Sequence, residues 1–333
     1  MMRRIISLAV LGGSLLASPV HAAETLNAFM NWTLHGQHAP WFVAKARAYF
    51  AQAGLDVNIQ RGFGSGDTVK KLLTGVADIG LADPLPIILA VAEGQPIKAI
   101  MGGFTLEPCV LYSAADKGNV HVPKDMEGKS MGGPPADNCL ILLRAVMEKA
   151  GADYSKVKIE SMDPPTRIPM LAAGRIDAAA DFTGSEILWS KALREAGKQV
   201  VTMPYAPYVS KYGLMVAVAD RTIKEKPDVL RRVTLALLRG YQDQLKDPDA
   251  AAATLLAAHP ELDRDYVVSS ARTLLNLVWD ETTRAKGLGV LNPAKMQSTI
   301  AITATFWKLP RTPAPEEVFT NEFIEWAHAQ LKK

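Results

Sequence analysis

The sequence predicts an α/β protein in which two doubly wound lobes are joined by a hinge of two chain crossovers. Short apolar strands alternate with helices in the first part of the chain, and the same alternation returns between residues 129 and 203. A short pattern of residues occurs once in each of these two units, and the last third of the chain reads as helices. Helices that alternate with short buried strands imply mainly parallel sheets covered on both faces.

The first residues have the pattern of a secretory signal peptide. Residues 1–4 are basic, and the apolar segment at 5–16 is shorter than the about 20 residues that span a bilayer. Val20 and Ala22 fit the small-residue rule for cleavage, so we expect a signal peptide at 1–22, cleaved near Ala22, and a periplasmic mature protein. No cysteine follows the apolar segment, so a lipid anchor is not expected.

Length and charge narrow the class of protein further. About 310 residues remain after cleavage, which is enough for two domains. The formal net charge of +3 falls to +1 once Arg3 and Arg4 are removed, so charge gives no indication of a nucleic-acid partner. The six histidines are scattered and no phosphate-binding glycine loop of the Walker type is present. We therefore expect a monomer with no metal and no cofactor.

The first unit reads as four strands with three helices between them. Its strands are short, apolar or alternating, and bounded by Gly, Pro or polar residues, which predicts strands over 25–29, 55–59, 77–81 and 97–101. The helical periodicity between them predicts helices over 40–50, 68–74 and 86–93. Pro40 suits a first helical turn, and Gly54 and Gly75 suit helix ends.

The second unit repeats the plan of the first. The same signals predict strands over 129–132, 157–160, 176–181 and 200–203. Helices are expected over 140–150, 169–173 and 187–196. The segment at 72–80 resembles the segment at 171–179, because each ends a short helix at a glycine and continues through an aspartate into a small-residue strand. If the two lobes share one order of strands and helices, the ends of these two strands would meet at one crevice between the lobes.

The rest of the chain predicts helices and sets the expected domain boundaries. Amphipathic patterns predict helices over 229–245, 249–258, 263–277 and 293–307, with a last helix after 320–323. We expect crossovers near 111–114 and 204–208. The first lobe would then be discontinuous, with residues 24–112 plus 205–333, and the second lobe would hold residues 113–204.

The two cysteines, Cys109 and Cys139, leave two interpretations open. An exported compartment permits a disulfide between them. Sequence does not say whether their Cα atoms come within bonding range, so two buried free thiols are the preferred expectation.

The segment at 31–45, NWTLHGQHAPWFVAK, resembles the opening of the NMT1/THI5-like (SsuA/THI5-like) family. The resemblance continues through the glycine-rich loop at 64–67 and through GVADIG at 75–80. It then extends to further matching segments at 122–129, 173–178, 246–251 and 320–323. It covers nearly the whole mature chain, and the order and spacing of the motifs make it specific.

The resemblance implies a type II periplasmic binding protein that serves an ABC importer and is not an enzyme. Members that resemble this chain bind thiamine pyrimidine precursors, and wider relatives bind sulfonates, nitrate, riboflavin or aromatic acids. On this basis we expect a small-molecule ligand, a small aromatic or heteroaromatic solute similar to a thiamine pyrimidine precursor. The expected partner is an ABC permease in the inner membrane.

Three alternatives stay open at this point. An alkanesulfonate, nitrate or an aromatic acid is a possible ligand, because Asp83-Pro84 and residues 133–137 depart from the pattern of the pyrimidine binders. An enzyme is another alternative, because some eukaryotic relatives make the thiamine pyrimidine with a cysteine-rich iron motif. Here the two cysteines lie 30 positions apart, and export would separate the chain from cytosolic pyridoxal phosphate. A sensor or partner-binding module is the third alternative.

Candidate site residues of the first lobe follow its first strand. Ligands of parallel sheets bind beyond the carboxyl ends of the strands, where Asn31 and Trp32 are expected. Trp32 can stack on a flat ring, and Asn31 can hydrogen-bond the edge of that ring. His38 precedes a helix and can face the cleft or cap the helix.

Two further candidate places of the first lobe lie at helix starts. Ser65 and Gly66 belong to the glycine-rich loop, whose backbone N–H groups can hold an anionic group. Asp83 ends a strand and can accept a hydrogen bond from an amino group of the ligand, or it can cap the following helix.

Candidate residues of the second lobe lie in two loops after parallel strands. Gly133 and Pro134 follow the strand expected at 129–132, and Asp181 ends the strand expected at 176–181.

Phe182, Gly184 and Glu186 loosely match the aromatic, glycine and acid of the pyrimidine binders. Glu186 is the acidic contact expected to oppose Trp32 across the cleft, unless it is a solvated residue of a first helical turn. Tyr212 lies near the second crossover, with Tyr205 and Tyr208, and can close over a ligand.

Overall fold

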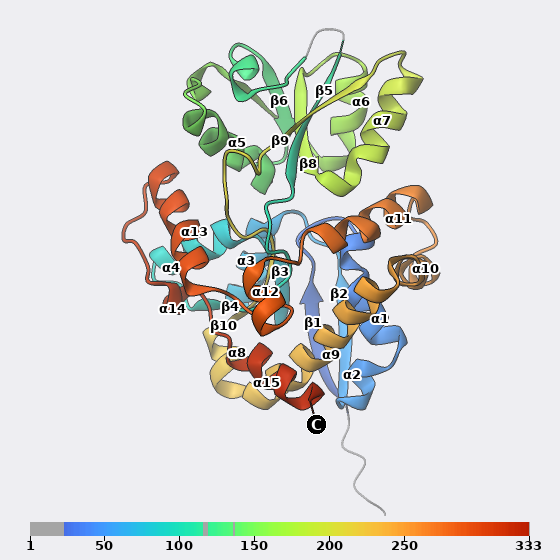
Figure 1. The fold of residues 1–333 in the computed structure, drawn as a ribbon, viewed down its shortest axis with the longest axis vertical. Helices are drawn as coiled ribbons and strands as arrows, with labels where there is room; N and C mark the ends of the chain where they lie inside the picture. Colours follow the sequence, from blue (N-terminus) through green and yellow to red (C-terminus); the bar gives the residue numbers. More distant parts are fainter. Residues whose placement is uncertain (1–22, 116–118, 136, 333) are drawn as a thin grey trace, which may run out of the picture.

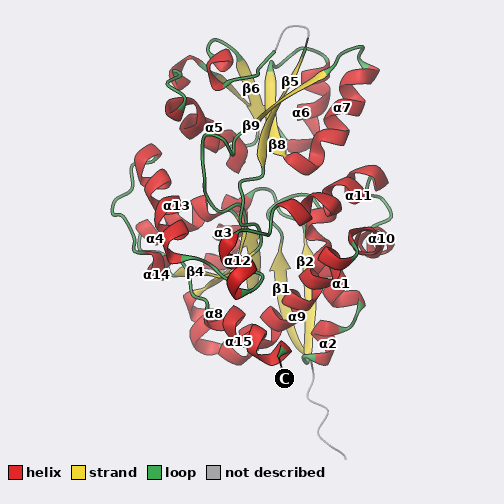
Figure 2. Cartoon of the chain, in the orientation of Figure 1, coloured by secondary structure: helices red, strands yellow, loops and turns green. Residues whose placement is uncertain are grey.

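The computed structural model describes residues 23–115, 119–135 and 137–332 and arranges them in two lobes, each built on a five-stranded sheet (Figures 1 and 2). Helices cover both faces of the sheets (Figure 2). The predicted α/β class with two sheet-based lobes is confirmed. The signal peptide expected at 1–22 lies outside the described residues.

The sheet of the first lobe has the strand order β2-β1-β3-β10-β4. Its strands are β1 Glu24–Phe29, β2 Leu55–Gln60, β3 Ile79–Ala82, β4 Ile97–Gly102 and β10 Met215–Ala219. β1 pairs in parallel with β2 and β3, whereas β10 runs antiparallel between β3 and β4. The helices between these strands are η1 Gly36–His38, α1 Ala39–Ala46, α2 Tyr49–Gln52, α3 Ser65–Thr74 and α4 Pro84–Ala92.

The second lobe repeats this arrangement with the strand order β7-β6-β8-β5-β9. Its strands are β5 Cys109–Ala114, β6 Ser130–Gly133, β7 Lys158–Ser161, β8 Ala178–Phe182 and β9 Val200–Pro204. β6 pairs in parallel with β7 and β8, and β5 runs antiparallel between β8 and β9. Its helices are η2 Pro123–Met126, α5 Asn138–Lys149, η3 Tyr154–Lys156, η4 Pro164–Thr166, α6 Arg167–Ala172, η5 Thr183–Ser185 and α7 Glu186–Glu195.

The C-terminal helices return to the first lobe (Figure 1). They are α8 Asp220–Glu225, α9 Pro227–Lys246, α10 Pro248–Ala258, α11 Arg264–Thr273, η6 Leu274–Asn276, α12 Glu281–Lys286, α13 Pro293–Phe306, α14 Pro315–Val318 and α15 Glu322–Leu331. α9 packs against α1 and α15, and α11 packs against both η1 of the first lobe and η5 of the second. Across the described ranges, none of these helices has the length and apolarity to cross a membrane.

β5 and β10 are the strands that the sequence did not reveal. Each follows another strand without an intervening helix, so neither belongs to the alternation of strands and helices from which the other strands were predicted. The crossover expected at 111–114 falls inside β5, and the chain crosses between the sheets at 103–108 and 205–214. We therefore propose lobe boundaries in these two loops, so that residues 109–112 belong to the second lobe.

Two helices differ from their expected limits. The helix expected over 40–50 is interrupted at Ala48, which has a left-handed φ of 58°, and its N–H donates to Lys45 O at 3.0 Å. α3 begins at Ser65 rather than at residue 68, because Gly64 adopts a φ of 121° and ends the loop there. This early start matters for the site, since it turns part of the glycine-rich loop into a helix N-terminus.

The pattern shared by the two units has the same structural role in both. Gly75 and Gly174 end their helices with φ values of 83° and 66°. Asp78 Oδ2 accepts from the N–H of Asn27 on β1 at 2.8 Å, and Asp177 Oδ2 accepts from the N–H of Ser130 on β6 at 2.8 Å. Each aspartate thus fixes the start of one strand against its neighbour, and both strand ends face the same side.

Lys211, in the second crossing, is buried between two carboxylates. Its Nζ lies 2.6 Å from Asp83 Oδ2 at the end of β3 and 2.7 Å from Glu107 Oε2 in the first crossing. Nζ also donates to Tyr212 O at 2.9 Å, and Glu107 Oε1 accepts from the N–H of Cys109 at 2.9 Å. One ammonium therefore joins both crossings to the sheet of the first lobe.

The ionisation of this cluster follows from burial and mutual attraction. Burial opposes the charge of Lys211, but Asp83 and Glu107 outweigh it and raise the pKa of the ammonium. Burial raises the pKa of Asp83 to about 7, with Lys211 acting in the opposite direction. Lys211 is therefore charged near neutral pH and depends on both carboxylates for its stabilisation.

Replacing Lys211 with methionine should lower the free energy of unfolding by roughly 3–5 kcal/mol, because two buried carboxylates lose their counter-charge. Urea denaturation followed by circular dichroism measures this change. Lys156→Met is a matched control: Lys156 pairs with Glu127 at 2.8 Å while half exposed, and its loss should cost about 0–1 kcal/mol. Equal losses for the two variants would show that the buried cluster contributes no more than a surface pair.

Candidate functional site

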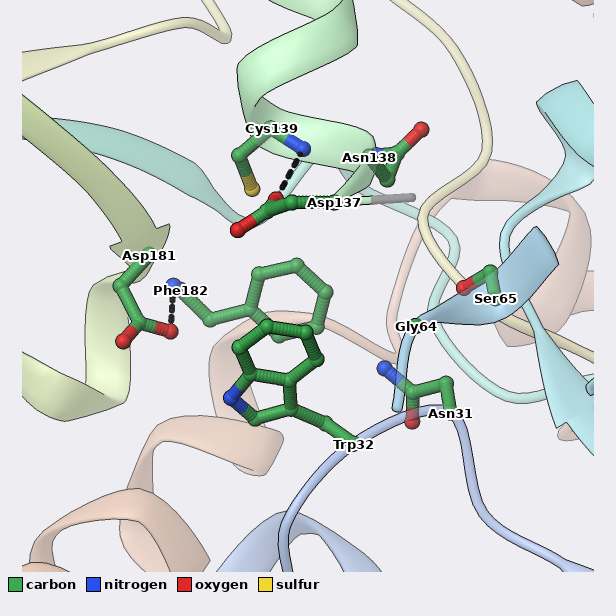
Figure 3. A pocket seen from close by; sticks show the side chains of 9 residues that line it. All are labelled: Asn31, Trp32, Gly64, Ser65, Asp137, Asn138, Cys139, Asp181 and Phe182. Carbon is green, nitrogen blue, oxygen red and sulfur yellow. Dashed lines mark hydrogen bonds between the residues drawn. The ribbon is translucent and has the colours of Figure 1, made fainter. Parts of the chain in front are cut away.

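A pocket that encloses only about 20 Å³ lies between the two lobes, beyond the carboxyl ends of their parallel strands. Figure 3 shows the rings of Trp32 and Phe182 directed into its centre. The lining residues come from both lobes: Asn31, Trp32, Gly64, Ser65, Asp137, Asn138, Cys139, Asp181 and Phe182. Asn31, Trp32, Ser65, Asp181 and Phe182 are candidate residues from the sequence, so the structure brings five of the candidates together.

The glycine-rich loop holds the Trp32 loop in place. The N–H of Gly62 donates to Trp32 O at 3.0 Å, and the N–H of Gly64 donates to Asn31 O at 2.9 Å. A Cβ on Gly62 would stand 2.0 Å from Met30 O, so no side chain fits this approach. The glycines therefore set the position of the aromatic side chain at the pocket.

His38 lies behind the pocket wall rather than in it. Its side chain is fully buried, and its Nε2 lies 3.0 Å from Asn31 Oδ1. The ring of His35 stands edge-on to it, with ring centroids 4.2 Å apart. Burial, and then the neighbouring His35, hold the pKa of His38 well below its ordinary value, so the imidazole is neutral.

Ser65 lines the pocket, whereas Asp83 lies behind Ser65 and does not line it. Ser65 is the first residue of α3, and its Oγ accepts from the N–H of Asp83 at 3.0 Å. Asp83 caps α4 through Leu85 N and pairs with Lys211, so both carboxylate oxygens are occupied within the protein. Gly66, the next residue of α3, is not among the lining residues.

In the second lobe the pocket is formed by the first turn of α5. Asp137 caps this helix, and its Oδ1 accepts from the N–H groups of Cys139 at 2.8 Å and Leu140 at 3.3 Å. Gly133 and Pro134, the candidates from this loop, precede the lining residues. Gly133 packs against Leu140 instead, whose Cδ1 would stand 2.9 Å from a Cβ at that position.

Arg167 is the charged residue at the site that the sequence analysis missed. It is the first residue of α6, is 3% exposed, and places Nη2 at 2.8 Å from Asp181 Oδ2. Nη1 lies 3.4 Å from Asp137 Oδ2, and the guanidinium lies 5.2 Å from the ring centroid of Trp32 in the other lobe. The sequence feature that could have indicated Arg167 is a basic residue at the start of the helix that follows β7.

The remaining candidates do not line the pocket. Glu186 is exposed at the start of α7, so Asp181 and Asp137, rather than Glu186, provide the carboxylates on this wall. Gly184 packs on α11, where a Cβ would stand 2.9 Å from Ser270 Cα. Tyr212 is buried in the first lobe and its hydroxyl accepts from the N–H of Asn292, while burial raises its pKa to about 12.

Cys109 and Cys139 form a disulfide, which corrects the expectation of two free thiols. The first residue of β5 and the first turn of α5 converge, which brings the two Cα atoms to 5.5 Å although 30 positions separate them. Both half-cystines are buried, and Cys139 lines the pocket. The disulfide therefore ties a wall of the pocket to the strand that follows the first crossing.

The charges around the pocket sum to a net negative value. Arg167 carries one positive charge, and Asp137 and Asp181 each carry a negative charge when ionised. Burial, with a contribution from Asp181, raises the pKa of Asp137 to about 6 despite the nearby Arg167. With both carboxylates ionised, the three groups together carry one negative charge, which disfavours an anionic ligand.

Comparison with known proteins gives a match to the family model described as NMT1/THI5 like over residues 35–251. The formylaminopyrimidine-binding protein of Halalkalibacterium halodurans is 24% identical over 81% of this chain and 82% of its own length. The riboflavin-binding protein RibY of Chloroflexus aurantiacus is 24% identical over 89% of this chain and 84% of its own. A 4-amino-5-hydroxymethyl-2-methylpyrimidine phosphate synthase of Schizosaccharomyces pombe is 28% identical over 31% of this chain and 29% of its own.

Solved structures establish the fold. The periplasmic aliphatic sulphonate binding protein SsuA from Escherichia coli superposes with a TM-score of 0.70 at 14% identity, over 90% of this chain and 99% of that chain. The periplasmic nitrate-binding protein NrtA from Synechocystis PCC 6803 gives 0.71 at 10% identity, over 93% of this chain and 89% of that chain. The chain therefore has the type II periplasmic binding protein fold.

Replacing both cysteines with alanine should lower the free energy of unfolding by about 3–4 kcal/mol, the loss that chain entropy predicts for a loop of this length. Guanidinium denaturation of the double variant against the oxidised wild type measures this loss. When the wild-type protein is unfolded without reductant, its cysteines should resist alkylation by iodoacetamide. Mass spectrometry measures the extent of alkylation. Full alkylation under those conditions would mean that the cysteines are not paired.

Proposed function

Because this chain belongs to the NMT1/THI5-like family, we propose that it captures a small, flat heteroaromatic solute between its lobes and delivers it to a membrane importer. The observation that carries this proposal is the pocket itself. Trp32 from one lobe and Phe182 from the other line the same pocket. A flat ring placed there would contact aromatic surface from both lobes, so binding would favour the closed arrangement.

Charge and size favour a neutral single-ring ligand. The net negative charge of Arg167, Asp137 and Asp181 opposes an anion and suits a ligand with N–H groups. The space enclosed in this arrangement is about 20 Å³, which is room for about one water, so the lobes must separate to admit a ligand, and a single ring requires less separation than the three fused rings of a flavin. A formylated aminopyrimidine, the compound after which one relative is named, is a single ring of this kind with N–H groups.

A small oxyanion such as a sulfonate is the second candidate. Two helix N-termini, those of α3 and α5, meet the pocket at Ser65 and Asn138, and helix N-termini favour negative charge. Arg167 would be the cationic contact, but it is already paired with two carboxylates. The anion would therefore have to displace one of these pairs, which makes the neutral ligand the better candidate.

We propose binding rather than catalysis. The similarity to binding proteins extends over more than four fifths of the chain, whereas the similarity to the synthase is confined to less than one third. Incubation with the bound pyrimidine, followed by mass spectrometry, should return the compound unchanged. Conversion to a product of different mass would support the enzyme instead.

The place of action that we propose is outside the cytoplasm, with an ABC permease as the partner. The signal-like residues at 1–22 and the disulfide support it, because disulfides persist in oxidising compartments. A fusion of the full-length chain to alkaline phosphatase, which is active only when exported, tests this location. Absence of phosphatase activity in cells that contain the intact fusion protein would contradict the proposal.

Titration with formylaminopyrimidine should change the tryptophan fluorescence of the protein, and Trp32→Phe should remove most of that change. Trp32→Ala should weaken binding by roughly 10- to 100-fold, since an aromatic stack with its buried area contributes on the order of 1–3 kcal/mol. Calorimetric titration measures the affinity. Trp307→Phe is the matched control, because Trp307 ends α13 outside the pocket.

The same titration with riboflavin, an alkanesulfonate and nitrate discriminates between ligand classes. We expect the pyrimidine to bind more tightly than each of them. Tighter binding of the sulfonate or nitrate would favour the anion, and absence of binding across the panel would contradict the proposed ligand class.

A further inference from the structure

Only one tautomer of the His38 imidazole fits its hydrogen-bond partners. Its Nδ1 lies 3.3 Å from the backbone N of His35, and a backbone N–H can only donate. Nδ1 must therefore be the acceptor, which leaves the proton of the neutral imidazole on Nε2. The lowered pKa of His38 agrees with a neutral ring.

The protonated Nε2 in turn fixes the amide of Asn31. Nε2 lies 3.0 Å from Asn31 Oδ1 and, as a donor, requires an oxygen there rather than the NH2 group. The NH2 group then has to point the other way. Figure 3 shows the nitrogen of Asn31 on the pocket side and its oxygen on the far side. No described residue accepts a hydrogen bond from this NH2 group.

Asn138 carries the side-chain amide on the opposite wall of the pocket, in the second lobe. It is 7% exposed, and its Oδ1 has no hydrogen-bond partner among the described residues. Figure 3 shows the oxygen of Asn138 directed away from the rings of Trp32 and Phe182, so the side-chain amide that faces these rings is the NH2 group of Asn31.

We propose that His38 is a positioning residue that holds the Asn31 amide with its NH2 group toward the pocket, so that the first lobe selects a ligand edge carrying a hydrogen-bond acceptor. This inference rests on the proposed function and deepens it. The ligand is then a neutral ring with a ring nitrogen that faces Asn31 as the acceptor.

Without His38, either orientation of the Asn31 amide becomes available. The oxygen could then face the pocket and repel the acceptor of the ligand. The expected effect is therefore a loss of discrimination between ligands that carry the acceptor and ligands that lack it. If His38 had a purely structural role, its loss would instead weaken the binding of both kinds of ligand to the same extent.

The test compares the affinity for formylaminopyrimidine with that for an analogue in which C–H groups replace the ring nitrogens. Wild type should prefer the pyrimidine by about tenfold or more, the equivalent of one hydrogen bond. His38→Met should reduce this preference to about twofold. His38→Gln should restore most of it, because the amide nitrogen of glutamine reaches the position of Nε2, whereas the shorter His38→Asn should not. Circular dichroism and thermal unfolding check that each variant folds.

An unchanged preference in His38→Met, with both affinities lowered equally, would overturn the proposal. If the wild type prefers the carbocyclic analogue, the proposal is overturned as well.

A second measurement separates failure of this proposal from failure of the proposed function. Long-range ¹H–¹⁵N NMR spectra of the ligand-free protein report which nitrogen of His38 carries the proton. We expect the Nε2–H tautomer, unchanged from pH 8 to pH 6. An Nδ1–H tautomer or an imidazolium would overturn the positioning role whatever the ligand is. The expected tautomer together with no binding of any compound would count against the proposed ligand class alone.

Discussion

The arrangement of the two lobes depends on the buried ammonium of Lys211. The chain passes between the sheets twice, and the backbones of the two passages hydrogen-bond to each other, as in the bond from the N–H of Gly103 to Leu214 O at 2.8 Å. Lys211 adds a charged link, because it pairs with Glu107 from the other passage and with Asp83 from the end of β3. Because an unpaired buried charge is costly, the two passages are stable only together, which fixes the sheet ends that face each other.

The two lobes share one plan for the strands and differ in the loops that meet the pocket. Asp78 and Asp177 occupy equivalent places beside their strands, and this common geometry aims the carboxyl ends of both sheets at one gap. The first lobe uses a glycine-held loop to present Trp32. The second places Arg167 against that same ring, so aromatic and cationic surfaces from unlike loops meet. Recognition therefore comes from the loops and not from the repeated framework.

Periodicity in the sequence located most strands and helices because those elements alternate between a core face and a solvent face. It missed β5 and β10, which follow β4 and β9 without an intervening helix and so lie outside the alternation of strands and helices. At the site, Trp32 and Phe182 could be placed because Trp32 lies shortly after β1 and Phe182 ends β8. The helix-capping role of Asp83 could also be predicted, but its pairing with Lys211, which lies 128 positions away, could not. The disulfide and Arg167 were missed for the same reason: their partners are set by tertiary structure.

The glycine at position 184 determines how closely the lobes can approach. It lies against Ser270 of α11, and a single methyl group there would meet Ser270 Cα at 2.9 Å. If the lobes close by a hinge motion, an alanine at position 184 would clash with Ser270 and hold the lobes apart. The apparent affinity would then fall in proportion to the fraction of molecules that still close, although every atom of the pocket is unchanged. Binding strength in this fold can thus be adjusted from outside the site.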